Sequence, residues 1–473
     1  MLPEELTNIV EKVRTQKTET QNIELKCANQ GSPTRLYDTL SSFSNQDEGG
    51  VIIFGIDEKD NYSLKGVYDA QDLQKKVTEQ CKQMEPAVRA LFTVCAIDGK
   101  TIVSAEIPGV SVDLRPVFYK GVGRLKGSYV RVGESDEQMS GYEVYSYEAF
   151  RKRIRDELRT IDDDKFSLIN KERLSKYLQD VKKERKNLAE NVSDSELLEL
   201  MGVTKGGYFT IAGLMSFSLY PQAYFPQFCI TAVVLPGSEQ GLSINDERFI
   251  DNKRITGSIP EMVEEAVDFV ARNSRKNTVI DYRGRRADRE EYPLKAVREA
   301  ILNALIHRDY SVYTENIPVR IEMYTDRMEI INSGGLYGNI SISELGQVRS
   351  DTRNLALANI LEILHTTENR YSGIPTIRNE FAMNNLPAPV FSVKHGDFKV
   401  VMRNSLYADS LSNEDAVIEF CSSPRTRDEI VSFVGKSKNF VMSQIVNPLV
   451  ESGKLKLTMP EKPKSPYQKY VRE

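Results

Sequence analysis

The chain has 473 residues, of which 40% are hydrophobic and 28% charged, and its net charge is −5 at pH 7. Because a domain commonly has about 100–200 residues, this length predicts two to four domains of ordinary globular composition. No run approaches the roughly 20 apolar residues of a membrane-spanning helix, and the amphipathic N-terminus lacks the basic and apolar regions of a signal peptide. We therefore expect a cytoplasmic protein without membrane contact, and any contact with nucleic acid must come from local basic patches.

Cysteine and histidine usage argues against a metal site built from these residues. The five cysteines form no CxxC pair, which excludes a zinc cluster and a disulfide framework. The three histidines, His307, His365 and His395, do not share a ligand spacing such as HxxxH. Metal chemistry would have to use carboxylates.

The first segment, residues 1–150, alternates helical patterns with short apolar runs that predict strands. We expect a strand at Glu19–Lys26, a helix over Leu36–Asn45 and a tight turn at Gly49-Gly50. Four further strands are expected at Val51–Ile56, Leu91–Ile97, Thr101–Ile107 and Ser128–Gly133. This pattern predicts an α+β domain.

Charged residues gather on the first of these strands. Alternation along a strand places Glu24 and Lys26 on one face and Leu25 on the other. Glu19 lies just before them, and Glu58 follows the exit of the next strand. The carboxylates and the ammonium group can therefore converge, although exposed polar positions on an edge strand would give the same pattern.

At these residues the chain resembles the Schlafen AlbA-type domain family. The family pattern is an E-x4-E-F-K strand, a helix ending in A-F-A-N, a G-G turn and a strand ending in G-V-D-D/E; Leu25 and Ser44 depart from it without removing a charge. The stretch Pro116–Ser135 is similar to the closing hairpin of the family. Some members cleave structured RNA, including transfer RNA, with a metal-bound carboxylate triad, whereas others are regarded as nucleic-acid binders only.

The resemblance implies a catalytic and metal-binding triad of Glu19, Glu24 and Glu58. Three carboxylates can hold Mg²⁺ or Mn²⁺ and leave open positions for water and a phosphate oxygen. Basic side chains near the triad would then hold the nucleic-acid strand by its phosphates, and we predict this role for Lys26, Lys120 and Arg131.

Residues 151–165 form a charged stretch that we interpret as a linker or a linker helix. The middle segment, residues 166–404, predicts a second α/β structure. Its main expected elements are a capping box at Ser193–Glu196, a strand at Cys229–Gly237, helices at Ser258–Ser274 and Tyr292–Ser311, and a hairpin around Thr325–Arg327.

In the second of these helices Glu299, Asn303 and His307 follow one another at intervals of four residues and share one face. This resembles the E-x3-N-A-x2-H box of GHKL-type ATPases, in which the Glu positions water and the Asn contacts Mg²⁺. The glycines of the implied nucleotide loops are Gly334, Gly335 and Gly373.

The whole middle segment resembles the divergent ATP-binding domain that often follows an AlbA-type domain in bacterial predicted regulators. Two features depart from a working ATP site: the adenine-reading Asp has no counterpart in IINSGGLYG, and the second loop has Gly373 in place of a glycine run. A GHKL-like α/β sandwich that binds ATP and one that is purely structural therefore both remain open.

The last segment, residues 411–473, predicts a winged helix-turn-helix of three helices followed by a short β element. Residues 436–473 include eight basic and three acidic side chains, against an acidic whole. Lys438 and Gln444 on the third helix and Lys462 and Lys464 on the wing are candidate contacts to nucleic acid. Alternatively, this segment mediates dimerisation or packs on the middle domain.

Our leading hypothesis is a Schlafen-like, metal-dependent endonuclease that acts on RNA of the tRNA type and is regulated by its C-terminal domains. The alternative is a non-catalytic, DNA-binding transcriptional regulator that senses a nucleotide. A third alternative is a scaffold that works as a homo-oligomer.

Overall fold

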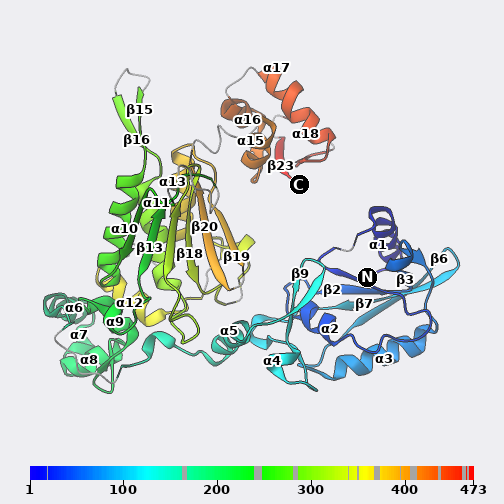
Figure 1. Ribbon diagram of the computed structural model, residues 1–473, viewed down its shortest axis with the longest axis horizontal. Helices are drawn as coiled ribbons and strands as arrows, with labels where there is room; N and C mark the ends of the chain where they lie inside the picture. Colours follow the sequence, from blue (N-terminus) through cyan, green and yellow to red (C-terminus); the bar gives the residue numbers. More distant parts are fainter. Residues whose placement is uncertain are drawn as a thin grey trace. The chain divides into compact units, whose positions relative to one another are not determined.

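The computed structural model describes all residues except 19, 162–167, 239–247, 281–285, 339, 349–350, 367–372, 395, 405–412, 435–437, 461–464 and 466–467. The chain divides into two compact units, Met1–Ile154 and Arg155–Glu473, and the predicted α+β multidomain class is confirmed (Figure 1). Among the described residues, no helix is both long and apolar enough to cross a bilayer.

The first unit is built on a four-stranded sheet of order β1-β2-β7-β6. Strand β1 (Ile23–Lys26) runs parallel to β2 (Gly50–Phe54), whereas β7 (Lys100–Ile107) and β6 (Leu91–Ile97) pair antiparallel. The remaining elements of the unit are β3 (Ile56–Asp57), β4 (Ser63–Leu64), β5 (Met84–Glu85), β8 (Phe118–Tyr119), α4 (Arg124–Gly127), β9 (Tyr129–Val132), β10 (Ser135–Gln138) and α5 (Gly141–Lys152).

Alternation along these strands gives the sheet two apolar faces, and helices cover both. Helix α1 (Pro3–Gln16) packs its buried side chains on one face, against residues such as Leu25 and Ile53. Helices α2 (Tyr37–Ser44) and α3 (Ala70–Lys82) cover the other face. The first strand is therefore fixed between two layers, which positions its polar side chains.

The predicted turn before β2 requires its glycines. Gly49 has φ +68°, and a Cβ atom there would lie 2.1 Å from the carbonyl oxygen of Ile107. A Cβ on Gly50 would lie 2.4 Å from the ring of Phe43. Only glycine allows α2 and β2 to approach this closely.

The second unit contains a six-stranded sheet of order β14-β13-β17-β18-β20-β19. Its strands are β14 (Asp251–Ile255), β13 (Ile230–Val234), β17 (Val319–Met323), β18 (Arg327–Ser333), β20 (Asp397–Arg403) and β19 (Val390–Lys394). Three helices cover one face of it: α10 (Ile259–Asn273), α11 (Leu294–His307) and α13 (Gly373–Met383) (Figure 1). This is the α/β sandwich expected from the sequence, and the hairpin β17-β18 has the predicted position.

Further helices precede and complete this sandwich. They are α6 (Lys171–Glu184), α7 (Lys186–Ala189), α8 (Asp194–Leu200), α9 (Ile211–Phe217) and α12 (Leu355–Ile363). Ser193 and Glu196 form the predicted capping box of α8. A small antiparallel pair, β15 (Lys276–Ile280) with β16 (Arg286–Glu290), stands between α10 and α11.

The charged stretch 151–165 is not one helix over its described part. Helix α5 ends at Lys152, and Arg153 takes the left-handed conformation that commonly ends a helix. A separate 3-10 turn, Asp156–Leu158, follows, and its central residue Glu157 is fully buried. The described part of the stretch therefore changes direction after α5 and packs against the second unit.

The C-terminal segment has the element order of the expected winged pattern. It contains α15 (Asn413–Phe420), β21 (Arg425–Thr426), α16 (Arg427–Val434), α17 (Lys438–Val441), α18 (Asn447–Glu451), β22 (Leu455–Leu457) and β23 (Lys469–Arg472). The strands form a sheet of order β21-β23-β22. A π-helical turn, Met442–Val446, joins α17 to α18, because Pro448 has no N–H to continue the α-helical ladder.

Candidate functional site

Strand β1 places Glu24 and Lys26 side by side on one face, as alternation predicts. The Lys26 ammonium group donates to Glu24 Oε1, and Leu25 is buried on the opposite face. The Glu24 side chain is 13% exposed and the Lys26 side chain 31% exposed. The pair is therefore partly exposed, and the Lys26 side chain is more accessible to solvent than the Glu24 side chain.

Arg131 on β9 lies beneath this pair. Its guanidinium contacts Glu24 Oε2 and Asp136 Oδ1, each at 2.9 Å, and stands over the ring of Phe43. Only 1% of the Arg131 side chain is exposed. Burial by itself lowers the pKa of Arg131, but Asp136 and then Glu24 raise it above the usual value, so the side chain keeps its charge.

Asp136 is held in turn by two hydroxyl groups of α2. Thr39 Oγ1 and Ser42 Oγ each donate to it at 2.6 Å. We call the four charged residues Glu24, Lys26, Arg131 and Asp136 the Arg131 network. Its charges cancel, which suits a cluster of which most lies below the surface.

Asp136 was not among the predicted site residues, although the sequence carries a signal for it. Gly133 has φ +61° and lies in the tight turn between β9 and β10. Register counted from this turn pairs Arg131 directly with Asp136. Reading the hairpin register would have predicted that Arg131 has an acidic partner.

The predicted triad is described only in part. Glu19 lies outside the described residues. Glu58 begins an exposed 3-10 turn after β3, and both oxygens of Glu24 contact cationic side chains. Within the described ranges, no group of three acidic, histidine or cysteine side chains is placed to hold a metal ion. Carboxylates suit a hard cation, but Glu24 could ligate one only if Lys26 released Oε1.

The three basic residues predicted to hold phosphates lie in different settings. Burial and two acidic partners leave Arg131 no open face toward a ligand, so its place is that of a positioning residue for Glu24. Lys26 is partly open at the surface. Lys120 is exposed and donates to the carbonyl oxygen of Lys82 at 3.5 Å.

The second candidate site is a pocket between α11 and α13. Helix α11 places Glu299, Asn303 and His307 along one face, and Asn303 Nδ2 donates to Glu299 Oε1 at 3.0 Å. Gly373 at the start of α13 packs against them: a Cβ there would lie 2.6 Å from Glu299 Oε1. Asn303, His307, Gly334 and Gly335 all line this pocket, which has a volume of about 110 Å³.

Burial among the pocket walls lowers the pKa of His307 to about 4, with a smaller contribution from Arg353. His307 is therefore a neutral imidazole at pH 7. The other walls are the amide residue Asn332, the acidic residue Asp351, and aromatic and aliphatic side chains that include Leu336, Tyr337, Ile340, Leu345, Ile374, Ile377, Phe398 and Val400. The lining suits a largely uncharged ring better than a phosphate.

The turn after β18 closes one side of the pocket. Gly334 has φ +112°, and a Cβ there would lie 2.9 Å from the backbone nitrogen of Asp309. Arg353 forms an ion pair with Asp309 at 3.1 Å and donates to the carbonyl oxygen of Gly335 at 3.1 Å. A buried ion pair therefore fixes the glycine turn against the end of α11.

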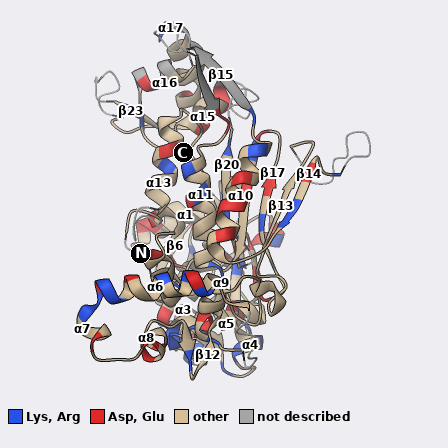
Figure 2. Ribbon diagram, turned by 90° about the vertical axis from the view of Figure 1, so that its left-hand side faces the viewer, with Lys and Arg blue, Asp and Glu red and all other residues tan. Residues whose placement is uncertain are grey.

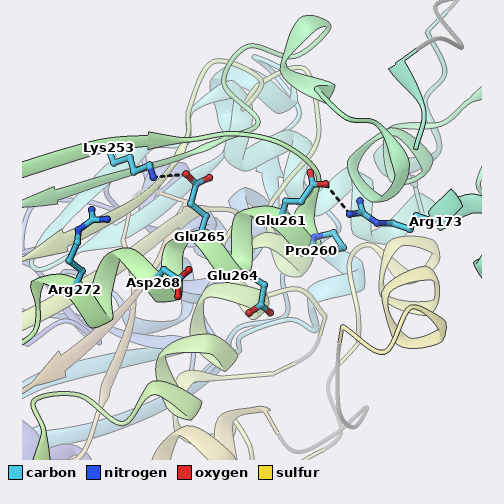
Figure 3. A pocket seen from close by; sticks show the side chains of 8 residues that line it. All are labelled: Arg173, Lys253, Pro260, Glu261, Glu264, Glu265, Asp268 and Arg272. Atoms are coloured by element: carbon cyan, nitrogen blue, oxygen red, sulfur yellow. Dashed lines mark hydrogen bonds and ion pairs between the residues drawn. The ribbon is translucent and has the colours of Figure 1, made fainter. Parts of the chain in front are cut away.

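A larger open groove of about 590 Å³ follows α10 (Figure 3). Four carboxylates line it at helical spacing: Glu261, Glu264, Glu265 and Asp268. Two of them are ion-paired across the groove, Glu261 with Arg173 at 2.9 Å and Glu265 with Lys253 at 2.6 Å. The acidic row is visible on α10 in Figure 2, but Arg173, Lys253 and Arg272 also line the groove, which leaves its four carboxylates largely balanced by three basic side chains.

The structure describes the predicted C-terminal contacts only in part. Lys438 is exposed at the start of α17, and the backbone of Gln444 lies in the π-helical turn. Lys462 and Lys464 lie outside the described residues. A basic surface on this segment therefore stays a prediction.

Two family models match parts of the chain. Residues 19–140 match the family described as Schlafen, AlbA_2, and residues 317–402 match the family described as putative ATP-dependent DNA helicase recG C-terminal. No curated protein matches the chain.

The chain is similar to two solved structures, and each alignment covers most of the solved chain. The DIP2311 protein from Corynebacterium diphtheriae is 17% identical, with a TM-score of 0.41, and the alignment covers 95% of this chain and 93% of that one. The N-terminal domain of a putative ATP-dependent DNA helicase RecG-related protein from Nitrosomonas europaea is 25% identical, with a TM-score of 0.24, and covers 28% of this chain and 92% of that one. From the two family matches, the chain carries a Schlafen AlbA_2 domain and a GHKL-like domain of the recG C-terminal type, and so is a nucleic-acid-related protein.

Proposed function

We propose that the chain binds nucleic acid through its AlbA_2 domain and cleaves RNA of the tRNA type there. The observation that carries this proposal is the partly exposed Glu24–Lys26 pair, held from below by the buried Arg131. A compact ammonium group that is partly exposed is suited to a phosphate, and a carboxylate held beside it is suited to ligate a hard cation.

In this proposal the exposed side chains of the site contact the nucleic acid, and the buried ones position them. Lys26 meets the incoming phosphate and leaves Glu24 as it does so. Arg131 keeps the carboxylate in place during this exchange, because its second partner Asp136 fixes it in the hairpin. Lys120 holds a phosphate further along the strand.

Mg²⁺ or Mn²⁺ is the proposed cofactor of this site, with Glu19, Glu24 and Glu58 as its ligands. Such an ion supplies a water molecule of lowered pKa and neutralises charge on the phosphate. Because Lys26 contacts the same carboxylate, the ammonium group competes with the ion for Glu24.

The test is to incubate the purified chain with total RNA, transfer RNA, single-stranded DNA and duplex DNA, each with Mg²⁺, with Mn²⁺ and with chelator. We expect cleavage of RNA that chelator abolishes. If every substrate stays intact although RNA binds, the catalytic part of the proposal is wrong and the binding part stands.

A second candidate function is that of a DNA-binding transcriptional regulator that senses a nucleotide without cutting nucleic acid. The pocket between α11 and α13 supports this candidate, because Asn303, His307 and the glycine turn line it together. ATP is the proposed ligand. Since about 110 Å³ holds only part of a nucleotide, binding requires the pocket to open.

Two measurements separate this function from the first. Calorimetry with ATP and Mg²⁺ should show binding that Asn303→Ala abolishes, with Asn191→Ala, an exposed amide of the same unit, as control. Sequence-selective duplex binding should require residues after Asn404, where Lys438, Gln444, Lys462 and Lys464 are the proposed contacts.

Light scattering tests whether the chain forms a homo-oligomer, and its cytoplasmic location remains a prediction.

A further inference from the structure

The segment that leaves the first unit docks on the second one. We call Arg155–Thr160 the strap; it follows Ile154, the last residue of the first unit. Gly202 allows the close approach of the strap to α12, since a Cβ there would lie 3.1 Å from Leu158 and 3.0 Å from Ala356. The strap therefore packs directly on the first turn of α12.

Glu157 is the buried centre of this contact. Its side chain has no exposed surface, and Oε1 accepts a hydrogen bond from the backbone nitrogen of Ala356 at 3.4 Å. Within the described part of the chain, Oε2 has no hydrogen-bond partner. A carboxylate at the N-terminus of a helix is favourable, but one with an unsatisfied buried oxygen is costly, so the surrounding packing must hold it there.

Arg159 makes the second contact of the strap. Its guanidinium donates to the carbonyl oxygen of Tyr310 and pairs with Glu315, each at 2.7 Å. Its own carbonyl oxygen accepts from the backbone nitrogen of Ile211 at 2.9 Å. The strap is thus bonded to the loop that follows α11, as well as to α9 and α12.

Both docking points continue into the wall of the pocket. Asn354, directly before α12, donates to the carbonyl oxygens of Ile306 at 2.7 Å and Arg308 at 2.6 Å. Its neighbour Arg353 holds Asp309 and the glycine turn. An unbroken series of contacts therefore runs from the strap through the start of α12 and the end of α11 to Gly335.

We propose that the strap is coupled to the pocket, so that the state of the pocket sets how firmly the strap docks on the second unit. A ligand that holds the glycine turn and Arg353 stabilises the docked strap. By reciprocity, RNA bound to the first unit changes the affinity of the pocket if it alters the strap. The biological consequence rests on the proposed function, whereas the coupling itself belongs to the second unit alone.

Hydrogen exchange followed by mass spectrometry on the full chain tests the coupling without any ligand or substrate. The reporter of the strap is the amide of Ile211, which donates to Arg159, and the reporter of the pocket is the amide of Asp309, which donates to Ser333 at 2.8 Å. We expect Glu157→Lys to speed exchange at both reporters by about tenfold or more, and Arg159→Ala to do so more weakly. Glu190→Lys, an exposed carboxylate of the same unit, should change neither.

Three results would overturn the coupling. Faster exchange at Ile211 with unchanged exchange at Asp309 would mean a docked strap that does not reach the pocket. No change at either reporter in both variants would mean that the strap is not docked. Equally faster exchange in α6, read at Leu174, would mean general destabilisation. If Glu157→Lys does not fold, Arg159→Ala alone gives the same readings. None of these results depends on whether the chain cleaves RNA.

Discussion

The Arg131 network of the first unit holds four charged side chains in contact, whereas the pocket of the second unit is lined mainly by amides, glycines and apolar side chains around a neutral histidine. The network is electrically balanced, so in the proposed function an incoming phosphate competes with Glu24 for Lys26. The pocket holds no such balanced cluster, but in the proposed function it must open. On these proposals, the first site selects its ligand by charge and the second by shape.

The largest expected effect is on the network. Asp136→Ala leaves the Arg131 guanidinium buried with Glu24 as its remaining carboxylate partner, and breaking such a pair costs about 3–5 kcal/mol. Urea unfolding of the full chain, with hydrogen exchange in β2 to assign the transition, measures this. Asp98→Ala breaks an exposed pair with Arg14 and should cost under about 1 kcal/mol. Equal effects of the two variants would contradict the account of a buried, balanced network.

Buried Glu157 and half-buried His307 of the second unit respond to pH in opposite ways. Burial raises the pKa of Glu157 from 4.5 to about 7, so its contribution to stability is full below pH 4.5 and is lost as pH rises through 7. The pKa of His307 is lowered from 6.5 to about 4, so its contribution is full above pH 6.5 and is lost as pH falls through 4.

Single substitutions should reveal these opposed slopes. In Glu157→Gln, stability of the second unit should rise by about 3 kcal/mol from pH 4 to pH 7, because only the histidine slope remains. In His307→Gln it should fall by a similar amount over the same range. Thermal unfolding from pH 4 to pH 8 measures both. Parallel pH profiles for the two variants would show that these groups are not buried as described.

Gly373 at the start of α13 limits the space beside Glu299 and Asn303. Gly373→Ala places a Cβ within 2.6 Å of Glu299 Oε1 and 2.8 Å of Asn303 Nδ2. Because both are ends of flexible side chains, they can turn away, and we expect the fold to survive with a stability loss of about 1 kcal/mol. Nucleotide affinity should fall at least tenfold, measured by calorimetry. If the nucleotide affinity did not change, the Glu299–Asn303 pair would not be part of the nucleotide-binding site.

The smallest expected effect lies on the surface of the first unit. Lys120→Ala removes one exposed ammonium group and should weaken RNA binding about twofold to fivefold, with a salt dependence reduced by about one unit of slope. Fluorescence anisotropy over a range of salt concentrations measures this. Lys12→Ala, on the exposed side of α1, is the matched control. Equal losses in the two variants would indicate a general electrostatic effect in place of a site.

Local patterns predicted how the side chains of β1 are arranged. Period-two alternation correctly placed Glu24 and Lys26 together and Leu25 in the core, because one buried face fixes the register of a strand. Alternation says nothing about depth, however. The burial of Arg131 depends on α2, whose hydroxyl groups hold Asp136, and these two hydrogen bonds join residues 97 and 94 positions apart.

The helical spacing of Glu299, Asn303 and His307 likewise predicted one lined face, and the glycine turn proved to meet it. The strap was not predictable in the same way. A single Glu in a highly charged stretch is expected to be exposed to solvent. Glu157 is buried because the strap packs on α12. Tertiary contact, which composition does not reveal, decides such cases.

The proposed role of Glu24 in the AlbA_2 domain is in RNA cleavage. Its most direct test is the single-turnover rate of transfer RNA cleavage by the wild type, by Glu24→Gln and by Glu79→Gln, an exposed carboxylate on α3. Gln keeps the size and the hydrogen-bond acceptor that Arg131 uses, so the fold should survive. We predict that Glu24→Gln lowers the rate at least about a hundredfold, because a ligand of the proposed metal ion is lost, while RNA still binds and Glu79→Gln cuts normally. Cleavage by Glu24→Gln at the wild-type rate would contradict this proposal.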